Sequence, residues 1–406
     1  MRKESSHDKS PVIAVPDFVG ELACGWDKIA VEVRRSIAES RAEKPILVVE
    51  CYPGVDELVL LNEFVSRFAP KLAIQASDAY HSRQKVDELI APFIGRKVPA
   101  SGSFPRLSLV NFFDAEPLWR LRRTIDELKD GLVLIVGCGA SLIAWGHVLV
   151  YADLARREAR QRFRHDEDGD IGKDHQALPA NLKGRGAFLV DCGVADRWKR
   201  PLIKRWDYLL DTNDPSQPKL AEGEDVRRGL HAAAKQPFQF APFCNSCLLE
   251  ENSLLLGFGD MRMEIPAIDL IFNQPQALLG EAAHARFGYD FPIRLDFPDQ
   301  VNGFEALDKG DGWREERASV GRAMIETRRH WFSKTVSPDT RGAVNVLNFI
   351  EGDEAIVESD RGAFEPVVVH RAETFVVPAS VGRYHVRPHG LSAGKEIAII
   401  TAFVKA

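Results

Sequence analysis

Residues that could support chemistry gather at two places in the chain, and the first is a turn after an apolar run. Gly54 lies within Glu50-Cys-Tyr-Pro-Gly-Val-Asp-Glu57, and Asp153 ends a second apolar run later in the chain. A glycine-containing turn between a strand and a helix can bind an anion through its backbone amides. Asp56 and Glu57 place negative charge at the expected helix start, which suits capping and would repel phosphate. We therefore expect a structural turn at Gly54, and nucleotide phosphorylation around Gly54 and Asp153 is the alternative.

Two further motifs have weaker implications. The glycine-rich stretch at residues 137–146 could bind an anion, but it lacks a well-placed acidic residue after a following strand. A tight turn between buried strands is therefore preferred to a dinucleotide site. Cys244-Asn-Ser-Cys247 has the spacing of half a zinc site or of a redox pair. The sequence has no second pair, so two thiols in a loop are the expected case.

The second place is the last third of the chain, where arginine, glutamate and histidine recur. Arg328, Arg329 and His330 precede two aromatic residues, a combination that could bind a sugar phosphate, because arginine binds phosphate in bidentate fashion. Packing of the aromatic pair against the first strand is preferred, and sugar-phosphate binding is the alternative. The predicted ligand-binding residues are Arg294, Arg328, Arg329, His330, Glu351, His370 and His385. The terminal histidines form no His-x-His pair, so no metal ligands are predicted.

The elements that must position the first group alternate between strands and helices. Strands are expected at residues 45–50, 71–75, 107–110, 132–136 and 147–151, and helices after the turn at Gly54 and at residues 116–129 and 152–163. Such alternation is typical of an α/β fold with a mainly parallel sheet. We predict this domain over residues 21–205, after a flexible tail at residues 1–20.

The second group requires a different architecture. Residues 206–300 are predicted to be a connecting region with a helix at residues 223–235, and the glycine-containing, charged residues 301–320 a linker. Short runs of alternating pattern then follow at residues 344–349, 354–358, 365–369, 374–377, 383–386 and 396–403. This spacing predicts an antiparallel jelly roll or barrel over residues 321–406.

One resemblance involves the first domain. Tyr151-Ala-Asp153 and the arginine-bearing stretch Leu154-Ala-Arg156-Arg157-Glu-Ala-Arg160-Gln-Arg162-Phe-Arg164 resemble the aspartate-ending strand and the following helix of P-loop kinases such as uridine kinases. The kinase phosphate loop is missing, because Val55 and Asp56 stand where lysine and serine or threonine are required. The resemblance implies a related fold. The arginines could bind phosphate or RNA, or form a solvated basic face.

A second resemblance covers about a third of the chain. Asn252-Ser-Leu-Leu-Leu-Gly-Phe-Gly259, Phe291-Pro-Ile-Arg-Leu-Asp-Phe297 and Val344-Asn-Val-Leu-Asn-Phe-Ile-Glu-Gly352 resemble segments of class I mannose-6-phosphate isomerases, whose C-terminal domain is a cupin. The resemblance implies a zinc-dependent aldose-ketose isomerase of a phosphorylated hexose. Asp299-Gln-Val-Asn-Gly303 replaces the histidine-bearing family motif, so zinc is expected for the family while its ligands are not found.

The resemblance therefore implies a protein of carbohydrate metabolism with impaired isomerisation. The alternatives are a non-catalytic module that binds a sugar phosphate or has a regulatory role, and a phosphotransferase that uses the N-terminal domain. The net charge of −6 and a pI near 6.0 disfavour a nucleic-acid partner. Six sparse cysteines favour a reducing compartment, and the charged N-terminus is unlike a signal peptide. We expect a cytoplasmic protein with no membrane partner.

Overall fold

The computed structural model describes residues 12–90, 107–164, 192–240, 253–281, 303–318 and 325–404. The chain divides into two compact units. The α/β unit comprises Asp17–Arg227 and Leu256–Pro266, and the β-rich unit comprises Met1–Pro16, Arg228–Leu255 and Ala267–Ala406.

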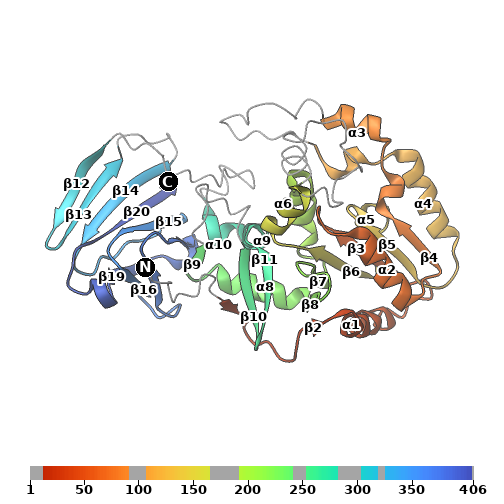
Figure 1. Cartoon of the computed structure of the whole chain (residues 1–406), viewed down its shortest axis with the longest axis horizontal. Coiled ribbons are helices and arrows are strands. Elements are labelled where there is room, and N and C mark those ends of the chain that lie inside the picture. The colour runs from red at the N-terminus through yellow and green to blue at the C-terminus, as the bar shows by residue number, and fades with distance from the viewer. Residues whose placement is uncertain are drawn as a thin grey trace. The chain divides into compact units, whose positions relative to one another are not determined.

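The α/β unit is organised around a seven-stranded sheet of order β2-β8-β7-β6-β3-β5-β4 (Figure 1). Its strands are β2 (Ala23–Cys24), β3 (Ile46–Cys51), β4 (Leu72–Gln75), β5 (Val133–Gly137), β6 (Val148–Asp153), β7 (Tyr208–Asp211) and β8 (Lys219–Glu222). The strands from β4 to β7 pair in parallel, and β8 and β2 add an antiparallel edge. The central strands are rich in valine, leucine and isoleucine because both of their faces are buried. This sheet confirms the predicted mainly parallel α/β fold. It extends beyond residue 205 because β7 and β8 complete it.

Helices complete this unit. They are α1 (Trp26–Glu39), α2 (Glu57–Phe68), α3 (Arg83–Ile90), α4 (Ala115–Glu127), α5 (Ala140–Ile143), α6 (Arg156–Arg164), a helix at residues 192–202, and the 3-10 turns η1 (Ala76–Ala79) and η3 (Leu109–Phe112). The helix α8 (Gly223–Ala233) is divided between the two units after Arg227. The strand expected at residues 107–110 is wrong, because η3 begins there. The Asn111 side chain accepts hydrogen bonds from the Ser108 amide at 2.8 Å and the Ser108 hydroxyl at 2.9 Å, which closes a turn.

The β-rich unit contains two antiparallel sheets. The larger sheet has the order β12-β13-β14-β20-β15-β18-β9, and the smaller has the order β17-β16-β19. The strands are β9 (Phe238–Phe240), β12 (Phe304–Gly310), β13 (Trp313–Ala318), β14 (Ile325–Phe332), β15 (Asn345–Glu351), β16 (Glu354–Ser359), β17 (Val367–His370), β18 (Thr374–Val377), β19 (Tyr384–Pro388) and β20 (Ile397–Val404). Phe349 and Phe375 from the larger sheet and Val357 and Val386 from the smaller sheet share one apolar core. The six predicted terminal strands and the predicted antiparallel fold class are therefore confirmed.

The linker predicted at residues 301–320 is wrong for its described part. Residues 304–318 form the hairpin of β12 and β13, and Gly310 pairs with Trp313 across its turn. Gly312 lies in the turn of this hairpin, where its φ of 80° favours glycine, whereas Gly310 ends β12. The strands escaped prediction because β12 exposes nearly every side chain and so shows no apolar alternation.

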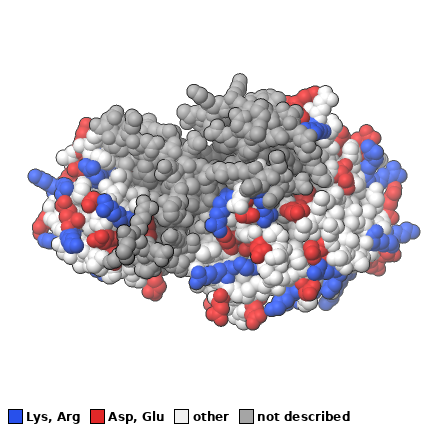
Figure 2. All heavy atoms as spheres, viewed as in Figure 1, with Lys and Arg blue, Asp and Glu red and all other residues white. Residues whose placement is uncertain are grey.

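The remaining elements are short. β1 (Val12–Ala14), β10 (Ser253–Phe258) and β11 (Met261–Pro266) form a three-stranded sheet. The described part of the predicted tail, residues 1–20, thus contains a strand. The other elements are α9 (Ile268–Asn273), α10 (Pro275–Leu279), η5 (Ala379–Val381) and η6 (Gly390–Ser392). Within the described ranges, no helix is long and apolar enough to cross a bilayer. Figure 2 shows basic and acidic side chains interspersed on its visible face, in keeping with a near-balanced charge sum.

Candidate functional site

The topology of the parallel sheet marks one edge as a candidate site. β3 and β6 are neighbours, but the chain leaves β3 for β4 on one side and leaves β6 for β7 on the other. Ligands of open α/β sheets bind at the carboxyl ends of strands where the connections diverge in this way. Tyr52 follows β3 and Asp153 ends β6, so both lie at this edge.

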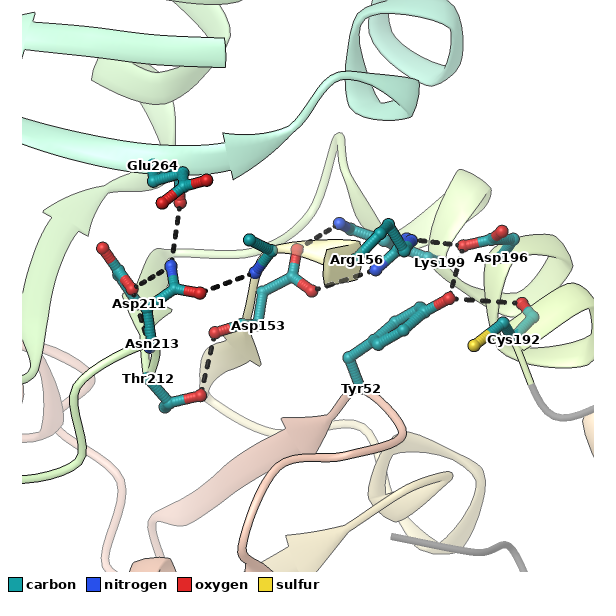
Figure 3. A network of polar contacts seen from close by, with 11 residues as sticks. Tyr52, Asp153, Arg156, Cys192, Asp196, Lys199, Asp211, Thr212, Asn213 and Glu264 are labelled. Carbon is teal, nitrogen blue, oxygen red and sulfur yellow. Dashed lines mark hydrogen bonds and ion pairs between the residues drawn. The ribbon is translucent and has the colours of Figure 1, made fainter. Parts of the chain in front are cut away.

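Five side chains converge there, and we name them the carboxyl-edge cluster: Tyr52, Asp153, Arg156, Asp196 and Lys199 (Figure 3). Lys199 Nζ forms an ion pair with Asp153 Oδ2, and Arg156 Nη2 donates to Asp196 Oδ1 at 2.7 Å. The Tyr52 hydroxyl donates to the same Asp196 oxygen at 3.1 Å, and the guanidinium of Arg156 lies 3.6 Å from the Tyr52 ring centroid. Arg156 is only 1% exposed and Lys199 is 0% exposed. Two cations and two carboxylates are thus withdrawn from water at a predicted ligand edge.

Several polar atoms of the cluster have no hydrogen-bond partner among the described residues. These atoms are Arg156 Nε, Arg156 Nη1 and Asp153 Oδ1. Nη1 and Oδ1 lie 3.6 Å apart, which is too long for a hydrogen bond. Burial acts against the charge of Arg156, but the nearby oxygens of Tyr52 and Asp196 raise its pKa, so the guanidinium stays charged. Burial raises the pKa of Tyr52, which therefore stays a neutral phenol.

The segment after β7 holds the start of α6. Asn213 Oδ1 accepts from the Ala155 amide at 2.8 Å, and the Thr212 hydroxyl donates to the Asp153 carbonyl at 2.9 Å. Arg162, which is buried, donates to the Gly54 and Thr212 carbonyls at 3.0 Å each. Arg156 and Arg162 therefore point inward, whereas Arg157 is exposed and pairs with Glu264 at 2.8 Å. The arginines predicted to be a solvated basic face are thus divided between the interior and the surface.

The turn after β3 is built for structure. Asp56 caps α2 by accepting a hydrogen bond from the Val59 amide at 2.9 Å, which confirms the capping role predicted for this acidic position. Gly54 has a φ of 95°, and a Cβ there would approach the Ala159 backbone to 3.2 Å. Glycine is needed because its φ is positive and because α6 packs closely against this position.

We predict a cost for losing this cap. Asp56→Ala should lower the free energy of unfolding by about 1 kcal/mol, because an alanine N-cap leaves a helix amide unpaired. Urea denaturation checks this value. Glu116→Ala, at the exposed first turn of α4, is the control and should have little effect. Equal effects from both substitutions would contradict the capping role.

The glycine-rich turn after β5 holds two carboxylates of the protein itself. Glu50 accepts from the Gly139 amide at 2.5 Å, the Ser141 amide at 2.8 Å and the Ser141 hydroxyl at 2.5 Å. Glu57 accepts from the Cys138 amide at 2.7 Å. Successive backbone amides of this kind form anion-binding concavities. Here glutamate side chains already occupy the amides, which argues against a phosphate at the same place. Glu50 could have been singled out in the sequence because it is a carboxyl-bearing residue at the end of an apolar run.

The β-rich unit has a second polar group, which we name the inner-face cluster: Glu315, Arg317, Glu326, Arg328 and His330. Strand alternation places these residues on the same sheet face as the core residues Trp313 and Phe332. Arg328 donates to Glu315 Oε1 at 3.0 Å and to Glu326 Oε1 at 2.5 Å. His330 Nε2 lies 3.4 Å from the same Glu315 oxygen. Burial lowers the pKa of His330, Glu315 opposes this effect, and Arg328 adds to it.

Arg329 is separated from its sequence neighbours by the same alternation. It lies on the opposite face, where it binds Glu316 at 2.5 Å and lies over the Phe304 ring at 3.9 Å. The structure therefore brings together two of the three adjacent residues predicted to act as one cluster. Trp331 shares the outer face with Arg329, and Phe332 packs in the core, so the aromatic pair is also divided.

The other predicted ligand-binding residues are dispersed. His370 lies 3.3 Å from Glu373, and Glu351 lies 3.7 Å from Arg371. His385 contacts Ser337 at 2.9 Å and Asp360 at 2.8 Å. Each of these three residues therefore contacts a different set of neighbours. Arg294, Cys244 and Cys247 lie outside the described residues.

The residues that the structure describes do not fit a zinc site. Apolar side chains fill the space between the two sheets, including Leu347, Phe349 and Phe375. Among the described residues, no group of three or more histidines, cysteines, aspartates or glutamates could hold a metal ion. A catalytic zinc needs about three such ligands at short distances, so the expected isomerase metal has no place in the described part.

Solved structures match about a quarter of the chain at low similarity. A putative mannosephosphate isomerase from Archaeoglobus fulgidus has 21% identity over 21% of this chain and 25% of that chain, with a TM-score of 0.18. A mutant phosphomannose isomerase from Salmonella typhimurium has 14% identity over 25% of this chain and 23% of that chain, with a TM-score of 0.20. An RmlC-like cupin from Shewanella frigidimarina has 18% identity over 27% of this chain and 89% of that chain, with a TM-score of 0.21. The chain thus spans about a quarter of the length of the two isomerases.

Sequence comparison assigns the first half of the chain. No curated protein matches the chain. One family model matches residues 25–235, which include β3 to β8 and both glycine turns described above. This match extends over more than half of the 406 residues. The chain belongs to the family described as Domain of unknown function (DUF8485).

Proposed function

We propose that this protein binds a phosphorylated hexose at the inner-face cluster and does not isomerise it. The observation that carries the proposal is the contact between Glu315, Arg328 and His330 on the face that borders the core. These groups are half-buried, so a ligand can reach them, and water competes for their hydrogen bonds less than it would at a fully exposed surface. Such a set fits the ligand class that the isomerase resemblance implies.

The charges of the cluster suit a phosphorylated sugar. Arg317 and Arg328 are cross-strand partners, and like charges in this position destabilise a sheet unless an anion lies between them. Glu326 provides one anion, at 3.4 Å from Arg317 and 2.5 Å from Arg328. Arg317 is exposed and retains donors for a phosphate. Glu315 and His330 can contact sugar hydroxyls beside the half-buried Trp313 ring.

Binding without turnover is the function that the described residues support. Metal-assisted isomerisation needs a Lewis acid to polarise the carbonyl, and the described residues offer no zinc ligand set. A phosphotransferase in the α/β unit is disfavoured, because Asp56, Glu50 and Glu57 surround the amides that would bind phosphate.

The alternation of the strands provides matched variants for a binding test. Isothermal titration calorimetry with mannose 6-phosphate should show binding by the unmodified chain. Glu315→Gln and Arg328→Lys should weaken it at least about tenfold, because each removes a charge-assisted hydrogen bond. Glu316→Gln and Arg329→Lys, on the opposite face, should leave it unchanged.

Three results would contradict the proposal. Unmodified protein without affinity for hexose phosphates would exclude the ligand class. Equal losses from the inner-face and outer-face variants would exclude the site. Bound zinc together with turnover of mannose 6-phosphate would show an isomerase.

A further inference from the structure

The carboxyl-edge cluster contains polar atoms that the fold leaves unsatisfied. Among the described residues, Arg156 Nε and Nη1 are buried donors without a hydrogen-bond acceptor, and Asp153 Oδ1 is a buried acceptor without a hydrogen-bond donor. Nη1 and Oδ1 form an ion pair at 3.6 Å, which leaves the hydrogen-bonding capacity of both atoms unused. Buried polar atoms without hydrogen-bond partners cost about 1–3 kcal/mol each, so a bound group that pairs with them is favoured. Because they lie where the sheet topology favours ligands, we propose that this cluster binds a protonated oxyanion, specifically hydrogen phosphate.

The chemistry of the ligand follows from the two kinds of unpaired atom. The guanidinium needs an oxygen that accepts, and Asp153 needs a group that donates. Hydrogen phosphate carries both, because its P–O oxygens accept and its P–OH group donates. Sulfate has the same shape but no proton near neutral pH, so it would place an oxygen against the Asp153 carboxylate. The cluster should therefore discriminate between these two anions.

Charge and burial bear on the ligand. The sequence of α6 has five arginines and one glutamate, so its surroundings favour an anion. Lys199 and Arg156 add two buried cations. Lys199 pairs with Asp153, and Arg156 pairs with Asp196 at 2.7 Å and with Asp153 at 3.6 Å. Arg156, Asp153 and Lys199 are each at most 2% exposed, so these groups favour a small anion without a large attached body.

Inorganic phosphate and phosphate monoesters can be separated by pH. Inorganic phosphate keeps a P–OH group at pH 8, whereas a monoester loses its last proton above about pH 6. Isothermal titration calorimetry on the full chain in phosphate-free buffer should show inorganic phosphate binding at pH 8. Sulfate should bind at least about tenfold more weakly, since it lacks one hydrogen bond to a charged group. The alternative source of the bound phosphate group is a monoester. It would be identified by binding of hexose 6-phosphate that appears only below pH 6 and persists in Glu315→Gln.

Variants of the cluster test its role. Arg156→Lys should weaken phosphate binding at least about tenfold, because lysine lacks the planar array of donors. Arg157→Lys, one residue along α6 and exposed, is the matched control and should bind as the unmodified chain does. Asp153→Asn should narrow the difference between phosphate and sulfate, because its amide can donate to either anion. Thermal melting checks that each variant is folded.

The unmodified protein alone can overturn the proposal. No heat of binding with phosphate, or equal affinities for phosphate and sulfate, would exclude a protonated-oxyanion site even if every variant unfolds. A crystal structure with only a water molecule between Arg156 and Asp153 at saturating phosphate would also exclude it. The inner-face variants Glu315→Gln and Arg328→Lys should not change phosphate affinity, so this inference and the proposed function fail separately.

Discussion

Lys199→Met is expected to lower the free energy of unfolding of the α/β unit by about 3–5 kcal/mol, because it removes the nearest cation of the buried Asp153 carboxylate and leaves only Arg156 Nη1, at 3.6 Å. Lys199 is fully buried, and its ammonium lies 5.2 Å from the Tyr151 ring centroid and 5.6 Å from the Trp206 ring centroid. Methionine keeps an unbranched apolar chain beside these rings, so the change removes the charge more than the packing. Urea denaturation followed by circular dichroism measures the loss.

Two comparisons make this result specific. Lys204→Met, at an exposed position close by, should change stability by less than about 0.5 kcal/mol. The double variant Lys199→Met with Asp153→Leu should be more stable than Lys199→Met alone, because no uncompensated charge then remains. If the double variant were no better than the single variant, the loss would come from packing and not from the ion pair.

The α/β and terminal β folds could be predicted because their strands carry local signals. Residues 45–50 and 132–136 are nearly unbroken apolar runs, as expected for strands buried on both faces. The run at residues 374–377 was predicted with its observed bounds. Each pattern is complete within a few residues, so these strands can be predicted without knowledge of their distant partners.

The hairpin of β12 and β13 could not be predicted because its stabilising contacts are non-local. Glu315 and Glu316 on β13 pair with Arg328 and Arg329 on β14, thirteen residues away. Cross-strand ion pairs replace the apolar alternation by which a strand is recognised in sequence. A charged, glycine-containing stretch of this kind has the composition of a linker when its partner strand is unknown.

The candidate sites show the same division between local and distant signals. Asp153 could be singled out because it ends an apolar run. Its partner Lys199 lies 46 residues further along the chain, on a helix whose sequence shows only that Asp196 and Lys199 are three residues apart. Only the fold joins these positions. Arg328 and Arg329 were grouped as sequence neighbours, whereas the register of β14 places them on opposite faces.

Glu50 should lower the stability of the folded protein progressively as the pH rises from about 4.5 to 7 and beyond. Burial raises the pKa of Glu50 from 4.5 to about 7, although hydrogen bonds from Ser141 and Gly139 partly oppose it. The folded state therefore holds a proton that the unfolded state has released between about pH 4.5 and pH 7, so raising the pH favours unfolding. At 1.36 kcal/mol per pKa unit, ionising this carboxyl costs about 3 kcal/mol of stability by pH 8.

Glu50→Gln isolates this contribution, because glutamine does not titrate. The difference in unfolding free energy between the unmodified chain and Glu50→Gln should shift by about 3 kcal/mol toward the variant between pH 4.5 and pH 8. Glu116→Gln, at an exposed position, should give parallel curves. Ser141→Ala should move the transition to higher pH, because it removes a hydroxyl hydrogen bond that favours the ionised carboxylate. Parallel curves for Glu50→Gln would mean that folding does not raise the pKa of Glu50. The three hydrogen bonds that favour the ionised carboxylate would then outweigh the effect of burial.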